Sequence, residues 1–168
     1  MADTQQAENA LGRAGELLVR GVAGDDYLQT HGRLGRPLVI LHPAGGMYSW
    51  FVPMTISRHL VGFMLLSPEL EFLRFTVLQR RPGSLEGAPD AADWLAPERV
   101  LSAAARITRP DERLTDPVLT YDQVPDRLAW RVEARSPDGT TRRIMVAGGT
   151  AYEPKDLTDT IGGQETIG

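Results

Sequence analysis

The chain has 168 residues, a formal net charge of -4 and no cysteine, a length that suits one domain or two small subdomains sharing a core. With 42% hydrophobic and 24% charged residues, the composition is globular rather than disordered, and the negative charge argues against a nucleic-acid backbone as the main partner. No apolar run approaches the roughly 20 residues of a membrane helix, and the polar segment 1–16 does not resemble a signal peptide. We therefore expect a cytoplasmic protein that needs no disulfides.

Two amphipathic helices are predicted, one near the start of the chain and one near residue 100. Over residues 7–22, apolar side chains recur at three- and four-residue steps and so share one helical face. Asp3 or Thr4 can cap this helix at its N-terminus. The second helix fits residues 97–107, where Pro97 suits the first helical position.

Runs of strand-forming residues follow each predicted helix. The predicted strands are 37–42, 47–56, 59–66 and 71–79 in the first half, and 117–121, 127–135 and 140–147 in the second. Short turns such as the Ser-Pro-Asp-Gly sequence at 136–139 separate them. Strands joined by such turns pair antiparallel, because a parallel pairing needs a long crossover.

The two halves resemble each other in sequence. One set of matches has an offset of 80 residues and comprises the pairs Pro37/Pro117, Trp50/Trp130 and Val52/Val132. A second set has an offset of 69 and relates Ser67, Pro68, Arg74, Phe75 and Val77 to Ser136, Pro137, Arg143, Ile144 and Val146. The two offsets predict an internal repeat of a helix plus an antiparallel meander. Their difference predicts one additional hairpin arm in the first unit, near residues 57–66.

We therefore predict an α+β fold made of two tandem helix-plus-antiparallel-sheet units with a flexible C-terminal tail. The predicted divisions are 1–80 for the first unit, 81–96 for a linker, 97–152 for the second unit and 153–168 for a disordered tail. Because a single helix and sheet face make a small core, we expect each helix to pack on its own sheet and the units to pack together. The large side chains available for this core are Trp50, Phe51, Phe63, Phe72, Phe75, Tyr121 and Trp130.

The second half also resembles a known family. The segments concerned are Pro117-Val118-Leu119-Thr120-Tyr121-Asp122, Leu128-Ala129-Trp130-Arg131-Val132, Ser136-Pro137-Asp138-Gly139 and Ile144-Met145-Val146. Together they resemble a PepSY domain over about residues 97–152 and, through the repeat, over 7–79. PepSY domains occur in propeptides of thermolysin-type metalloproteases and in stand-alone bacterial proteins, and their fold is cystatin-like, with a helix across an antiparallel sheet. The resemblance implies this fold and an inhibitory or chaperoning role without catalytic residues. The chain departs from the family pattern at 147–151, where an Asp, small residue, Thr-Gly element is usual.

No group of residues in the sequence forms a recognisable catalytic, cofactor or metal site. The segment 37–46 is similar to the first strand and His-x-x-Gly-Gly oxyanion loop of α/β-hydrolase thioesterases. The chain lacks a Gly-x-Ser-x-Gly elbow, so we interpret this segment as a hairpin turn. His31, His42 and His59 lack metal-ligand spacing; His42 and His59 can meet across the first sheet, but a lone histidine at a strand end is more often solvated. We predict no enzyme activity, no catalytic residue, no cofactor and no metal.

The segment after residue 153 carries a short repeated motif. An acidic-Thr-Ile-Gly sequence occurs at 159–162 and again at 165–168. Such a motif can add to a partner's sheet edge or dock in a groove with its isoleucines as anchors, and two copies raise its local concentration. The candidate partner-binding residues are Ile161, Gly162, Ile167 and Gly168.

The favoured hypothesis is a non-catalytic protein-binding module that acts through a sheet surface, a loop or the tail on a partner protein. In that case the tail is a docking motif, or a peptide that is carried or modified. The alternative is a small-molecule-binding or enzymatic domain with an apolar cavity between helix and sheet. Exposed edge strands also permit a homo-oligomer.

Overall fold

The computed structural model describes residues 3–155 and contains helices with two antiparallel sheets, which confirms the predicted α+β class. The first unit consists of α1 (Thr4–Val19), α2 (Asp26–His31), β1 (Arg33–Leu34), β2 (Leu38–Leu41), β3 (Met47–Ile56), β4 (His59–Leu66) and β5 (Phe72–Val77). The second consists of α3 (Ala91–Leu95), α4 (Pro97–Ala105), β6 (Arg113–Leu114), β7 (Val118–Tyr121), β8 (Leu128–Arg135), β9 (Thr141–Ala147) and β10 (Thr150–Tyr152). None of the helices in this range has the length and apolar character that crossing a membrane requires.

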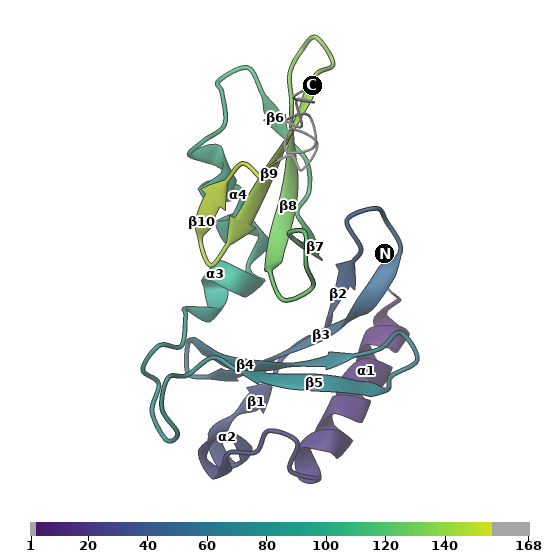
Figure 1. The fold of residues 1–168 in the computed structure, drawn as a ribbon, viewed down its shortest axis with the longest axis vertical. Coiled ribbons are helices and arrows are strands. Elements are labelled where there is room, and N and C mark those ends of the chain that lie inside the picture. Colours follow the sequence, from purple (N-terminus) through teal and green to yellow (C-terminus); the bar gives the residue numbers. More distant parts are fainter. Residues whose placement is uncertain (1–2, 156–168) are drawn as a thin grey trace, which may run out of the picture.

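Helix α1 is capped by Asp3, one of the two predicted caps, and begins at Thr4, three residues before the predicted range. The Oδ1 atom of Asp3 accepts a hydrogen bond from the backbone N–H of Gln5 at 3.2 Å, which satisfies one of the free N–H groups of the first turn. The helix ends at Val19, three residues before the predicted end, and Gly21 follows in the left-handed region with φ +86°. Its apolar face lies on the first sheet (Figure 1).

Each unit has one five-stranded antiparallel sheet. In sheet A the order is β1-β3-β4-β5, and β2 also pairs with β3 beyond the end of β1. In sheet B the order is β10-β9-β8-β6, and β7 also pairs with β8. The short elements α2, α3, β1, β6 and β10 were not predicted, whereas β3 and β4 have the predicted bounds.

The strand registers of the two sheets repeat with an offset of 80 residues, except beyond the irregularities at Ile40/Leu41 and Met54/Thr55 of sheet A, where they differ by one residue. Trp50 lies opposite Leu66 in sheet A, and Trp130 lies opposite Val146 in sheet B. The edge pairings repeat as well, since Leu38–Phe51 corresponds to Val118–Arg131. The prediction of an extra hairpin arm near residues 57–66 is therefore wrong. That segment contains β4, which corresponds to β9, whereas the 69-residue offset matched β5 to β9 on the strength of a common Ser-Pro turn.

One hydrophobic cluster joins the two units, as expected. It comprises Ile40, Phe51, Phe63 and Leu65 from sheet A with Val100, Ala103, Ala104, Leu119, Leu128, Trp130, Val132, Ala134, Ile144 and Val146 from the second unit. The opposite face of sheet A packs through Trp50 and Val52 on Ala10, Ala14 and Leu17 of α1. Sheet A is thus a middle layer between its own helices and the second unit (Figure 1). Phe72, expected in the core, is 39% exposed because it lies on the edge strand β5.

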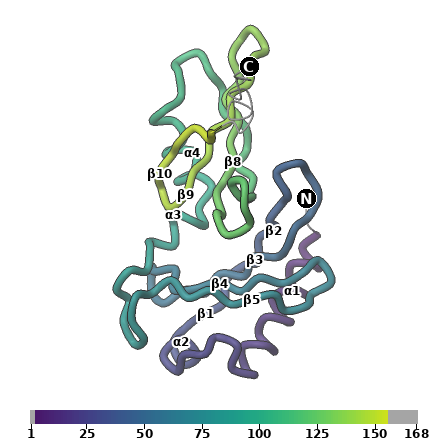
Figure 2. The backbone as a smooth tube through the Cα atoms, in the orientation of Figure 1, coloured from purple at the N-terminus to yellow at the C-terminus, as the bar shows by residue number. Residues whose placement is uncertain are grey.

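The segment between the units is tied to sheet A along part of its course (Figure 2). The backbone N–H of Leu60 donates to the carbonyl oxygen of Pro89 at 2.9 Å, and that of Ala91 donates to Arg58 at 2.8 Å. Helix α3 lies inside the predicted linker, and its first turn is capped by Asp90. The connection therefore positions α3 against β4.

Candidate functional site

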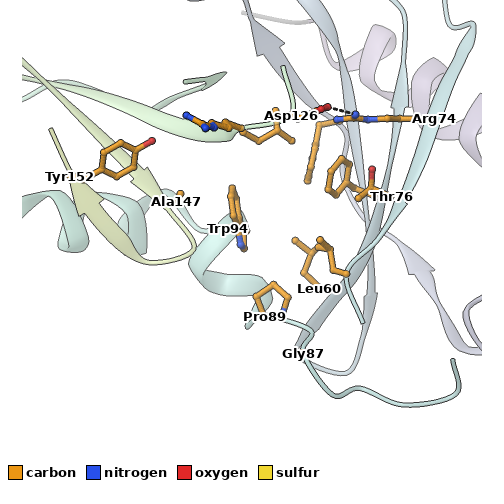
Figure 3. Close-up of a pocket in the computed structure, with 14 residues that line it drawn as sticks. Leu60, Arg74, Thr76, Gly87, Pro89, Trp94, Asp126, Ala147 and Tyr152 are labelled. Atoms are coloured by element: carbon orange, nitrogen blue, oxygen red, sulfur yellow. Dashed lines mark hydrogen bonds and ion pairs between the residues drawn. The ribbon is translucent and has the colours of Figure 1, made fainter. Parts of the chain in front are cut away.

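A half-open cleft of about 690 Å3 lies between sheet A and the second unit. Figure 3 shows Leu60, Arg74 and Thr76 on the sheet A side, facing Trp94 and Asp126 of the second unit. The apolar part of the lining comprises Phe51, Leu60, Phe63, Leu78, Pro89, Trp94, Leu128 and Ala147. Its size is within the range of roughly 300–1,000 Å3 that is usual for ligand sites.

Helix α3 holds Trp94 at the cleft. Asp90 Oδ1 accepts a hydrogen bond from the backbone N–H of Ala92 at 2.9 Å and starts the helix. The carbonyl oxygen of Trp94 accepts a hydrogen bond from Nε1 of Trp130 at 2.8 Å. A Cβ atom added to Gly148 would lie 3.4 Å from the Trp94 indole nitrogen, so the β9–β10 turn also approaches the ring. The backbone of Trp94 is therefore held in place, and its ring forms one wall of the cleft.

The polar groups of the cleft lie at its rim. Arg74 of β5 and Asp126 of the β7–β8 turn form an ion pair of 2.5 Å that bridges the two units. Their side chains are 39% and 78% exposed, so the pair is worth at most about 1 kcal/mol and is weakened by salt. The backbone of Arg127 is hydrogen-bonded within the β7–β8 turn, but its exposed guanidinium has no hydrogen-bonding or ionic partner among residues 3–155. The rim thus offers one cation that is free to meet an anionic group.

Tyr152 of β10 occupies the far side of the cleft. Its hydroxyl donates a hydrogen bond to Asp122 Oδ2 at 2.8 Å. Burial, together with this bond to a carboxylate, raises the pKa of Tyr152 to about 12. The phenol is therefore neutral at physiological pH and acts as a hydrogen-bond donor rather than as a base.

The edge strand β5 runs along the cleft. In the described part of the chain β5 pairs only with β4, so its second edge has no strand partner there. Arg74 and Thr76 line the cleft, while Leu73 and Val77 are 47% and 42% exposed. Arg74 is the single charged residue of β5, and the rest of this largely apolar edge is suited to pairing with another strand.

The predicted hairpin at 37–46 is confirmed. The backbone N–H of His42 donates to the carbonyl oxygen of Gly46 at 2.9 Å, and that of Gly45 donates to His42 at 2.9 Å. Gly45 and Gly46 have φ of +101° and +84°, which explains why glycines are needed there. Because two of these N–H groups are bonded within the turn, they are not available as oxyanion donors.

The histidines do not converge. His42 follows β2 at one end of β3, whereas His59 pairs with Ile56 at the other end. Nδ1 of His42 lies 3.0 Å from the hydroxyl oxygen of Tyr121, which links the two units near the meeting of β2 and β7. Nδ1 of His59 is buried and unpartnered within the described range. Across residues 3–155, no group of three or more His, Cys, Asp or Glu side chains is arranged to hold a metal ion.

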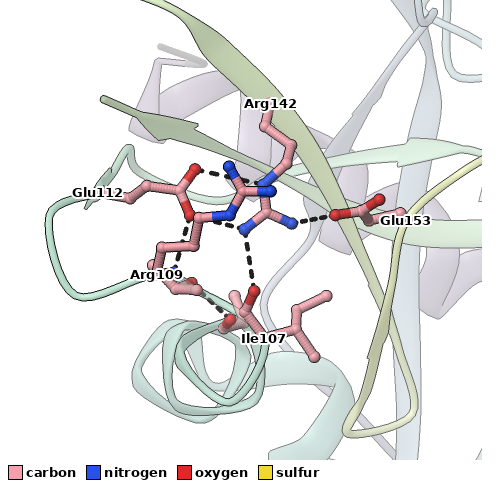
Figure 4. Close-up of polar contacts among 7 residues, drawn as sticks. Ile107, Arg109, Glu112, Arg142 and Glu153 are labelled. Atoms are coloured by element: carbon pink, nitrogen blue, oxygen red, sulfur yellow. Dashed lines mark hydrogen bonds and ion pairs between the residues drawn. The ribbon is translucent and has the colours of Figure 1, made fainter. Parts of the chain in front are cut away.

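An ionic network fixes the chain after β10 (Figure 4). Arg142 donates to Glu112 Oε1 at 2.6 Å, to the carbonyl oxygen of Ile107 at 2.9 Å and also to Glu153. The hydrogen bond from Arg142, followed by one from the backbone of Arg109, lowers the pKa of Glu112 to about 2. Glu153, which we placed at the start of the tail, is therefore held against the second unit.

The partner-binding residues predicted from sequence, Ile161, Gly162, Ile167 and Gly168, lie outside the residues that the structure describes. The cleft was not predicted, because its lining comes from segments up to 101 positions apart, Phe51 to Tyr152. One local signal was present: Trp94 is a large aromatic residue beside a linker rich in Gly, Pro and Asp.

Comparisons of the chain with protein-family models, with curated proteins and with solved structures found no match.

Proposed function

We propose that the protein is a non-catalytic binding module that holds an extended segment of a partner protein along β5. An apolar side chain of that segment enters the cleft between the units. The observation that carries this proposal is the position of a largely apolar strand edge, free of a strand partner in the described range, directly beside an apolar cleft.

Strand addition explains both features together. An extended peptide that pairs with β5 makes main-chain hydrogen bonds to its free edge, and pockets for alternate side chains give specificity. Arg74 and Thr76 of β5 already face the cleft. The side chains of an added strand that lie on this same face would point toward the cleft, and those on the other face would lie beside Leu73 and Val77.

The charges at the rim define the chemistry of the partner segment. Arg127 is exposed and has no ionic partner in the described range. Arg74 forms an ion pair with one exposed carboxylate, that of Asp126. A segment with one large apolar residue and an Asp or Glu a few positions away would fill the cleft with the apolar side chain and form an ion pair with Arg127. The PepSY resemblance supports this proposal, because the inhibitory and chaperoning roles of that family act on other proteins.

A displayed library of extended peptides tests the proposal, with two matched variants as controls. Thr76→Trp fills the cleft from β5, whereas Val77→Trp places the same side chain on the opposite face of that strand. We expect selected peptides to be enriched in one large apolar and one acidic residue. Their affinity should fall at least tenfold, about 1.4 kcal/mol, in Thr76→Trp and stay within threefold in Val77→Trp. Equal effects of the two variants, or no enrichment, would refute the proposal.

The volume of the cleft favours a second candidate, a small apolar ligand bound between the units. The cleft of this candidate lies between the units, whereas the cavity expected from the sequence lay between helix and sheet, where a smaller hollow of about 350 Å3 is lined by α1 residues and Trp50. This candidate predicts that apolar small molecules raise the Tm of the wild-type chain and of Val77→Trp, but not of Thr76→Trp. It also predicts that the peptide library yields no binders.

A further inference from the structure

A second groove, of about 400 Å3, lies on the second unit. Trp130 and Ile144 point to the face of sheet B that packs on α4, so the alternate residues of β8 and β9 lie on the other face. Arg131 and Met145 lie opposite each other there, and both line the groove. Met145 is only 3% exposed and forms an apolar floor.

The groove has an excess of positive charge. Arg131, Arg143 and Lys155 line it, and none of them has an ion-pair partner within residues 3–155. Among the described residues, Asp122 is the only acidic one in the lining, and its Oδ2 atom already accepts a hydrogen bond from Tyr152. The lining therefore has a net charge of +2. Arginines in such an arrangement favour carboxylate groups, to which they donate paired hydrogen bonds.

One acidic segment of the same chain begins at this groove. Pro154 and Lys155, the last residues that the structure describes, both line it, so residue 156 follows directly from its wall. The segment 156–168 contains Asp156, Asp159 and Glu165 and no Lys, Arg or His, which gives its side chains a charge of -3. We propose that segment 156–168 binds in the basic groove of its own chain.

The distances permit this binding. An extended chain covers at most about 3.3–3.6 Å per residue, so the Cα of Asp159 can lie up to about 14 Å from that of Lys155. Arg131 and Arg143 sit diagonally across the β8–β9 pair, with Cα atoms separated by about 7–8 Å as is usual for such neighbours. The first acidic-Thr-Ile-Gly copy, at 159–162, can therefore reach both arginines and bring its isoleucine over the Met145 floor.

This binding would connect the groove with the cleft between the units. Asp122 lines the groove and Tyr152 lines the cleft, and a hydrogen bond of 2.8 Å joins them. An acidic segment in the groove would bring negative charge close to this Asp122 carboxylate. Binding of the segment in the groove would thus affect the hydrogen bond of Tyr152, on the far wall of the cleft.

A spin-label experiment on the full chain tests the proposal. The protein has no cysteine, so Gln164→Cys gives a single nitroxide site inside the segment. Paramagnetic broadening of backbone amides is then compared between the otherwise wild-type chain and a version that also carries Asp156→Asn, Asp159→Asn and Glu165→Gln. The neutral version keeps the tether, and so it measures the broadening that proximity alone produces.

We expect the amides of residues 131, 143 and 145 to be broadened at least threefold more in the acidic chain than in the neutral one. Arg143→Gln should remove most of this excess, and so should about 0.5 M salt, because exposed ion pairs are screened. Arg36→Gln, which changes an exposed arginine of the first unit, should leave it unchanged.

Three results would overturn the proposal. The acidic and neutral chains would broaden the same amides equally if charge did not hold the segment. The excess would centre on cleft residues such as Thr76 if the segment bound there. In a mixture of isotope-labelled protein without the nitroxide and unlabelled protein with it, broadening of the labelled chain would show that the segment of a second copy fills the groove.

Discussion

Gly62 lies at a point of close approach in the middle of sheet A, and its replacement by alanine should destabilise the fold. Gly62 is buried on β4 opposite Val77 of β5. A Cβ atom at this position would lie 2.7 Å from the carbonyl oxygen of Thr76 and 3.0 Å from two ring atoms of Phe75. The ring can turn aside, but the carbonyl oxygen belongs to the backbone. The added methyl group therefore forces β5 away from β4.

Overpacking of this kind costs about 1–3 kcal/mol, which we expect as the loss in the free energy of unfolding of Gly62→Ala. Gly12→Ala is the matched control, because Gly12 is exposed on α1 and an added Cβ meets no atom within 4 Å. There the same change should stabilise the protein by about 0.4–1 kcal/mol, since alanine is the better helix former and restricts the unfolded chain.

Urea denaturation followed by tryptophan fluorescence and by circular dichroism measures both changes. The two variants should shift the transition midpoint in opposite directions, and their unfolding constants should differ by more than tenfold, which corresponds to about 1.4 kcal/mol. A Gly62→Ala protein as stable as the wild type would show that β5 can move without cost, and would refute the close packing of β4 and β5.

Three further predictions concern single polar groups. Thr120→Val removes the 2.8 Å hydrogen bond from the buried Thr120 hydroxyl to the carbonyl oxygen of Leu41, and should cost about 1 kcal/mol in the same urea experiment. The pKa of Glu112 is lowered from 4.5 to about 2, chiefly by a hydrogen bond from Arg142. Its stabilising effect is therefore complete above about pH 5 and is lost as the pH falls toward 2, so the Tm of Glu112→Gln should depend less on pH over this interval. The pKa of Tyr152 is raised from 10.0 to about 12, so its stabilising effect is lost as the pH rises from 10 through 12, and Tyr152→Phe should remove a late step from the tyrosinate absorbance titration.

Each of these predictions has a contrary outcome. A Thr120→Val protein with unchanged stability would show that the contact between β2 and β7 does not contribute to the docking of the units. Parallel Tm curves for wild type and Glu112→Gln below pH 5 would mean that the carboxylate of Glu112 is not held by Arg142 in solution. A Tyr152→Phe protein that loses absorbance near pH 10 and keeps the late step would mean that this phenol titrates with the other tyrosines.

The sequence was most informative where periodicity and turn chemistry agreed. The bounds of β3 and β4 were predicted correctly because the apolar run breaks at the Ser-Arg turn between Ile56 and His59. Helices α2 and α3 were missed because they have only six and five residues, although Asp25 and Asp90 cap them. Helices this short depend on tertiary contacts, which local propensity does not report.

The cleft could not be predicted for a related reason. Its two walls are brought together by the packing of Phe51 and Phe63, whose rings stack with centroids 4.7 Å apart, against the second unit. The alternation of side chains between the two faces of β3 and β4 predicts that these side chains are buried. It does not predict which other segment covers them. The exposure of Phe72 has the same origin, because only the arrangement of the strands makes β5 an edge.

The hydrophobic cluster shared by the two units has a consequence for dividing the chain. Without residues 97–152, the side chains of Ile40, Phe51, Phe63 and Leu65 would face water, although each contributes about 1.5–3 kcal/mol when buried. This loss is comparable with the whole stability of a small protein, about 5–15 kcal/mol. The repeated units are thus halves of one cooperative fold, and a cut in the exposed loop near Gly83 would produce two fragments that regain structure only by reassociating. If each fragment were fused to another molecule, reassembly of the fold would report that the two fused molecules are close together.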